Sequence, residues 1–70
     1  MRLQMTVELR DRQWHAVFSD APDRESVAAS PKDAIWRLFE ASPGRQIDPR
    51  SITADAPDSE SRLHFSVEGR

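Results

Sequence analysis

Two histidines, His15 and His64, are the side chains of this 70-residue sequence best suited to acid–base chemistry near neutral pH. Each lies in a segment whose alternation of apolar and polar residues is typical of a β-strand. Each histidine therefore points to the face opposite its apolar neighbours. A catalytic pair of imidazoles needs a carboxylate to orient each ring, and by pattern only Glu8 and Glu68 share that face. Because histidine is common at half-buried positions, the sequence favours surface histidines over a catalytic pair.

The carboxylates are more numerous, but local structure explains the positions of most of them. Asp20 and Asp23 lie in a turn that contains a proline, and Asp33 follows Ser30 at the spacing of a helix cap. Metal-dependent hydrolysis needs several carboxylates that converge on the ions. There is no cysteine, which excludes disulfides and thiolate metal sites, and two histidines are too few for a histidine-rich one. We therefore predict no catalytic residues, no cofactor and no metal site, and a protein that is not an enzyme.

Exposed tryptophan and arginine side chains are better candidates for an interface with another protein. Trp36 lies at the edge of a helical apolar stripe, about 100° from Ile35, and tryptophan is enriched at interface hot spots. It could equally cover the edge of the core. Arg10 and Arg12 lie near strand ends, where they could pair with acidic groups of a partner or belong to a solvated face. The interface candidates are Trp36, Arg10, Arg12, His15 and His64, together with an exposed sheet edge.

Two strands and a tight turn form the first part of the chain. Alternation of apolar and polar residues from Leu3 to Leu9 predicts a half-buried strand, and a second strand is predicted from Gln13 to Ser19. A two-residue turn at Asp11-Arg12 would join them. The predicted register then pairs residue 9 with 14, residue 7 with 16 and residue 5 with 18, all on one face.

A short third strand (25–29), a helix and a last strand (63–67) complete the predicted order. Ser30 is a good N-cap and Pro31 suits the first helical position, while Pro43-Gly44 ends the helix. Its apolar stripe is Ala34, Ile35, Leu38 and Phe39. Residues 45–61 are expected to form a loop, either mobile or with a short strand or helical turn near 50–53. The sequence thus predicts one α+β domain over residues 1–70, in the order β-β-β-α-β, with one helix on one face of a small antiparallel sheet.

Composition and size narrow the classes of function. The formal net charge of −2 argues against direct binding to nucleic acids or anionic membranes through bulk charge, and no apolar run is long enough to span a membrane. No apolar signal-peptide core is found, so a cytoplasmic location is expected. A chain this short has a thin core and no disulfide, so we expect it to be stabilised as a homo-oligomer, most simply a dimer.

The run from Trp14 to Ala41, WHAVFSDAPDRESVAASPKDAIWRLFEA, resembles the HicB-like antitoxin domain. The shared features are an aromatic-led second strand, the acidic-proline turn at Asp20 and Pro22, a short third strand and a helix that starts at Ser30-Pro31. Together with the leading strand, the resemblance covers about the first 41 residues. It implies a β-β-β-α-β unit shaped like a truncated ribonuclease H.

The resemblance also implies a function. Members of that family neutralise a small toxin that cleaves RNA, so the implied partner is a small basic protein of this kind. No ribbon-helix-helix or helix-turn-helix segment follows the last predicted strand. The hypothesis is therefore a non-catalytic protein-binding module. The alternative is a small structural protein that only associates with itself and has no toxin partner.

Overall fold

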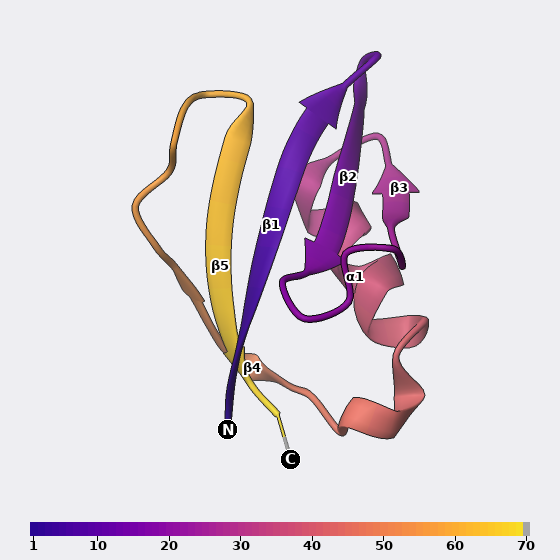
Figure 1. Cartoon of the computed structure of the whole chain (residues 1–70), viewed down its shortest axis with the longest axis vertical. Coiled ribbons are helices and arrows are strands. Elements are labelled where there is room, and N and C mark those ends of the chain that lie inside the picture. The colour runs from indigo at the N-terminus through magenta and orange to yellow at the C-terminus, as the bar shows by residue number, and fades with distance from the viewer. Residues whose placement is uncertain (70) are drawn as a thin grey trace.

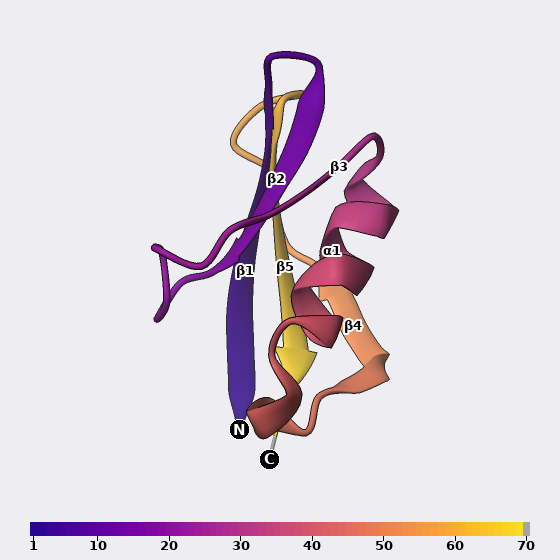
Figure 2. The ribbon, with the colours of Figure 1, turned by 90° about the vertical axis from the view of Figure 1, so that its right-hand side faces the viewer.

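A computed structural model describes residues 1–69 as one antiparallel sheet of five strands with a helix packed on one face (Figures 1 and 2). The elements are β1 (Arg2–Arg10), β2 (Gln13–Phe18), β3 (Ser26–Ala28), α1 (Pro31–Glu40), a single 3₁₀ turn (Pro43–Arg45), β4 (Asp48–Ala54) and β5 (Arg62–Glu68). Their order across the sheet is β3-β2-β1-β5-β4. The α+β class, with one helix on one face of an antiparallel sheet, is confirmed.

The β1–β2 hairpin has the predicted register. Met5 pairs with Phe18, residue 7 with 16, and Leu9 with Trp14. The first two pairs are buried under α1, whereas Leu9 is 39% exposed and Trp14 is half-buried at the tip of the hairpin. Alternation sufficed here because a one-residue slip would move every apolar side chain of the hairpin to the solvent face.

The hairpin turn has an unfavourable sequence for its geometry. Asp11 (φ 51°) and Arg12 (φ 65°) both adopt the left-handed conformation, as a type I′ turn requires. Arg12→Gly is therefore expected to raise the free energy of unfolding by about 0.5–1 kcal/mol, because glycine adopts this φ without a steric penalty. Urea unfolding measures the change. Arg12→Ala removes the same charge and should give no such gain, and an equal gain in both variants would contradict the explanation.

The helix begins as its sequence indicates. Ser30 is the N-cap, and its Oγ accepts a hydrogen bond from the backbone N–H of Asp33 at 3.2 Å. Ala34, Ile35 and Leu38 are buried against the sheet. The core consists of Leu3, Met5, Val7, Ala16, Phe18, Ala28, Ala34, Ile35, Leu38 and Val67. The N-cap fixes where α1 begins, and the apolar stripe is the side of α1 that packs on the sheet.

Of the alternatives predicted for residues 45–61, the short strand near 50–53 is confirmed in a longer form, because residues 48–54 form the edge strand β4. The order is therefore β-β-β-α-β-β, with β5 between β1 and β4. Pro49 argued against a strand, but an edge strand tolerates proline because one side of its backbone has no partner. Pairing of β4 with β5 is irregular, since five residue steps from Asp48 to Thr53 match two steps on β5. The Ser51 hydroxyl bridges this bulge, accepting from Glu68 N and donating to Asp48 O, both at 2.7 Å.

The helix covers only part of the sheet. It packs against β3, β2 and the near side of β1, and the sheet continues beyond it with β5 and β4. Figure 2 shows β4 curling toward the side of the sheet on which α1 lies. A helix is only about two strand spacings wide, so one helix cannot cover five strands.

Candidate interaction surfaces

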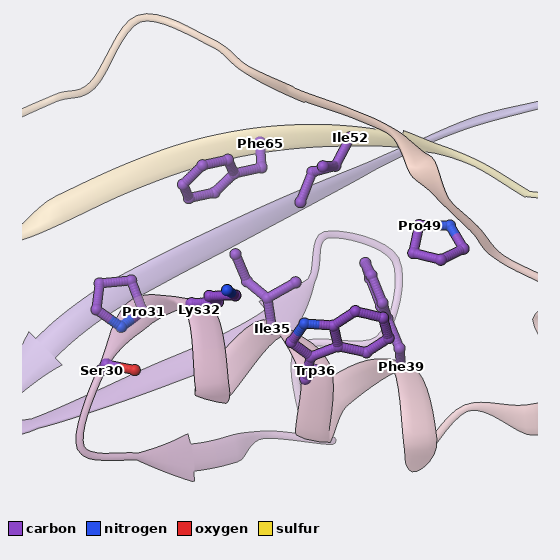
Figure 3. A pocket seen from close by; sticks show the side chains of 9 residues that line it. All are labelled: Ser30, Pro31, Lys32, Ile35, Trp36, Phe39, Pro49, Ile52 and Phe65. Atoms are coloured by element: carbon purple, nitrogen blue, oxygen red, sulfur yellow. The ribbon is translucent and has the colours of Figure 1, made fainter.

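An apolar groove lies between α1 and the strands β4 and β5, with a volume of about 500 Å³. Its lining consists of Ser30, Pro31, Lys32, Ile35, Trp36, Phe39, Pro49, Ile52 and Phe65. Figure 3 shows Phe65, Ile52 and Pro49 facing the side chains of α1 across this groove. We call these nine residues the apolar groove. Seven of them are apolar, and Lys32 carries the only charge.

The helical wall of the groove is a second apolar edge of α1. Ile35, Trp36 and Phe39 are spaced so that they share this edge. The rings of Trp36 and Phe39 meet edge to face, with centroids 5.9 Å apart and planes at 74°. Trp36 is nevertheless 45% exposed, as its place at the edge of the stripe predicted. It thus covers the edge of the core through Phe39 and also presents an indole to solvent.

The strand wall of the groove is apolar surface that α1 does not reach. Ile52 of β4 and Phe65 of β5 are half-buried, and Pro49 is exposed. Both Ile52 and Phe65 pack at the margin of the core. The sequence did not show that these three side chains share a groove, because residues 45–61 are predicted only as a loop or a short strand near 50–53 and because the pattern does not show where the single helix ends across the sheet.

The sheet edges are less suited to a partner than the groove is. The β4 edge contains Pro49, which has no N–H to donate, and the bulge that follows it. The β3 edge is only three residues long. Proline, bulges and short edge strands are features that block the addition of another strand. Neither edge of the sheet, at β4 or at β3, is therefore suited to pair with a strand of a partner, although an exposed sheet edge was predicted as an alternative interface.

On the opposite face of the sheet, charged residues form a continuous chain of contacts. In order of contact they are His15, Glu25, Arg10, Glu8, Arg62, Asp58 and His64. We call these seven residues the polar network. It crosses β2, β1 and β5, and the loops before β3 and β5 supply two of its members. Basic and acidic side chains alternate along it, so each carboxylate has at least two basic partners.

Each end of the polar network is a histidine held by a carboxylate from a loop. His15 Nδ1 lies 2.7 Å from Glu25 Oε1, and Arg10 contacts the other oxygen of Glu25. His64 Nε2 lies 2.9 Å from Asp58 Oδ2, and its Nδ1 is 3.4 Å from Thr6 Oγ1. The strand pattern offered only Glu8 and Glu68 as partners for these rings. Neither Glu25 nor Asp58 was found, because both lie in loops.

The structure brings together three of the five interface candidates and separates the other two. Arg10, His15 and His64 belong to the polar network, Trp36 lines the apolar groove on the other face, and Arg12 is exposed in the hairpin turn. The two histidines face the same side of the sheet, but β1 lies between their strands. Two strand spacings and a two-residue offset place their Cα atoms roughly 12 Å apart. Each ring is paired with its own carboxylate.

The contacts of the polar network lower the pKa of two carboxyl groups. The hydrogen bond to His15, with the contribution of Arg10, lowers the pKa of Glu25 below its ordinary value of 4.5. The hydrogen bond to His64, with the charge of Arg62, lowers the pKa of Asp58. A carboxyl whose folded pKa is depressed stabilises the fold above its unfolded pKa and loses that effect as the pH falls through the folded value.

We therefore expect the free energy of unfolding to decrease as the pH falls below about 4.5. Glu25→Gln should remove part of this acid dependence, and its effect should be about 0.2–1 kcal/mol because solvent screens the pair. Urea unfolding between pH 6 and pH 3 measures the slope. Glu60→Gln, at an exposed glutamate outside the network, is the matched control. Parallel pH profiles for the wild type and Glu25→Gln would contradict the assignment.

Residues 1–69 hold no group of three histidine, aspartate or glutamate side chains placed to bind a metal ion. None of the helices in this part of the chain has the length and apolar character needed to cross a bilayer. No protein-family model matches the chain, and comparisons with curated proteins and with solved structures give no match either.

Proposed function

We propose that this protein is a non-catalytic binding module that works by covering a partner protein with its apolar groove. The observation that supports this proposal is the open groove itself, an apolar concavity with a 45% exposed tryptophan on a chain with a small core. An apolar surface of this kind, rimmed by polar residues, is typical of interaction sites. Aromatic side chains in such a site contribute most of the binding free energy.

The resemblance of residues 1–41 to HicB-like antitoxins extends the proposal to the identity of the partner. On that basis the partner is a small basic ribonuclease of the toxin type, which the module would neutralise in the cytoplasm. The net charge of −2 favours encounter with a basic protein. Self-association into a homo-oligomer is the competing proposal, and it rests on the thin core of so short a chain.

Affinity capture from the lysate of the native host, quantified by mass spectrometry, tests the proposal. The wild type and Leu9→Ala, an exposed apolar position outside the groove, should recover the same small basic protein in near-equal amount. Trp36→Ala should lose it. Recovery of this chain alone from all three baits, with light scattering that shows one homo-oligomer, would replace the proposal with self-association.

A further inference from the structure

The apolar groove constrains the kind of polypeptide that can occupy it. Of its nine lining residues only Ser30, Lys32 and Trp36, through its indole N–H, carry polar side-chain groups, and Ser30 and Lys32 lie at the end of the groove where α1 begins. Figure 3 shows this end occupied by Ser30, Pro31 and Lys32, with Phe39 and Pro49 at the other. An extended peptide laid along the groove would leave its N–H and C=O groups facing apolar side chains. Unpaired backbone groups of this kind cost about as much as lost hydrogen bonds.

The neighbouring sheet edge cannot supply the missing hydrogen bonds. An added strand needs a regular row of free backbone groups, and β4 interrupts that row with Pro49 and with the bulge bridged by Ser51. A helix satisfies its own backbone hydrogen bonds except at its ends, so it can lie on apolar surface without such partners. The groove therefore selects a helical occupant over an extended one.

The dimensions of the uncovered sheet agree with this choice. Beyond α1 the sheet continues with β5 and β4, which present a strip about 10 Å wide. A helix with its side chains is about 10–12 Å across. A second helix beside α1 would complete a layer of two helices on a five-stranded sheet. Its apolar side chains would enter the groove between Phe39 on one wall and Phe65 on the other.

The helix of a second copy of this chain is a poor occupant. The apolar stripe of α1 is already buried against its own sheet. Its remaining surface exposes Lys32, Asp33, Arg37 and Glu40 around Trp36. Pressing that surface into the apolar groove would remove four charges from water, and the lining has only Lys32 to pair with one of the two carboxylates among them.

We infer that the apolar groove binds an amphipathic α-helix of another protein, with an acidic residue of that helix placed against Lys32. The inference rests on the proposed binding function and names the recognition element of the partner. Lys32 is the only charged residue in the lining, so one carboxylate on the incoming helix complements it and no other charge is needed. The partner can still be basic overall, because the groove meets only one face of one of its helices.

A displayed library of helix-forming peptides tests this inference. The peptides carry leucines at helical spacing, and the positions that flank the leucine stripe are randomised. Selection against the wild type should enrich Asp or Glu at one flanking position, and selection against Lys32→Glu should enrich Lys or Arg there. Amide NMR shifts caused by an enriched peptide should map to the apolar groove and leave the polar network unchanged.

Affinities of one enriched peptide for matched variants complete the test. Trp36→Ala and Lys32→Glu should each weaken binding by about tenfold or more, whereas Leu9→Ala should stay within about twofold. No enrichment, shifts on the polar network, or enrichment that ignores Lys32→Glu would overturn the inference. If the selection fails but lysate capture still recovers a Trp36-dependent partner, the inference that the occupant is a helix is wrong, and the proposed binding function stands. If lysate capture also recovers no partner, the proposed binding function is wrong as well.

Discussion

Replacing Phe18 by alanine is expected to destabilise the fold more than any other change considered. The ring is 1% exposed at the centre of the core, stacked on Phe39 with centroids 6.4 Å apart. The guanidinium of Arg45 lies 4.5 Å above its centroid and is held by Asp20 at 2.9 Å. Loss of a buried phenylalanine costs about 3–5 kcal/mol through lost burial and the cavity left behind.

A loss of this size is comparable with the whole stability of so small a protein. At about 0.05–0.15 kcal/mol per residue, a chain of 70 residues has about 3.5–10 kcal/mol in total. We therefore expect Phe18→Ala to lose about a third or more of the free energy of unfolding, seen as a lower midpoint in urea unfolding followed by circular dichroism. Phe18→Leu retains apolar volume but loses the cation–π contact with Arg45, and it should cost about 1–2 kcal/mol in urea unfolding. A cost below about 1 kcal/mol for Phe18→Ala would show that the core is not built around this ring.

Replacing Trp36 by alanine is expected to have the largest effect on binding. The indole is 45% exposed in the free protein and would be buried when the groove is filled. Hot-spot tryptophans contribute about 2 kcal/mol or more, so the dissociation constant of the captured partner should rise about 30-fold or more. The free energy of unfolding should fall by only about 0.5–1.5 kcal/mol, through the lost edge-to-face contact with Phe39.

The separation of these two effects distinguishes an interface residue from a core residue. Isothermal calorimetry with the captured partner gives the change in affinity, and urea unfolding gives the change in stability. Leu9→Ala is the matched control, because Leu9 is similarly exposed at 39% but lies outside the groove. If Trp36→Ala leaves the affinity unchanged, the indole only covers the edge of the core and the groove is not the binding surface.

Local pattern predicted those parts of the fold that depend on near neighbours in the sequence. The β1–β2 register followed from the alternation of Met5 and Val7 with polar residues together with the two-residue turn, because a one-residue slip would expose one apolar set and the turn length fixes the pairing. The start of α1 followed from Ser30 and Pro31, since capping depends on residues within one turn. The exposure of Trp36 followed from its angle on the helical wheel.

The same reasoning gave the edge strand β4 only as one alternative, a short strand near residues 50–53, and not its full length or its place in the sheet. Its residues do not alternate, and Pro49 argues against a strand. The strand forms because β5 offers it a free edge and because the Ser51 hydroxyl replaces ladder hydrogen bonds across the bulge. The β5 partners are more than ten residues away in the sequence, so no local window contains them.

The tertiary structure determines which residues lie together in the polar network and which line the apolar groove. The polar network needs β1 between β2 and β5, and it needs two loops to deliver Glu25 and Asp58 to the histidines. The apolar groove exists because one helix is too narrow for five strands and is seated over β3 and β2. The sequence alone specified a half-buried hairpin, a capped helix and an exposed tryptophan. The side chains that share a surface were determined by the order of strands in the sheet, because pairing between distant segments decides which side chains become neighbours.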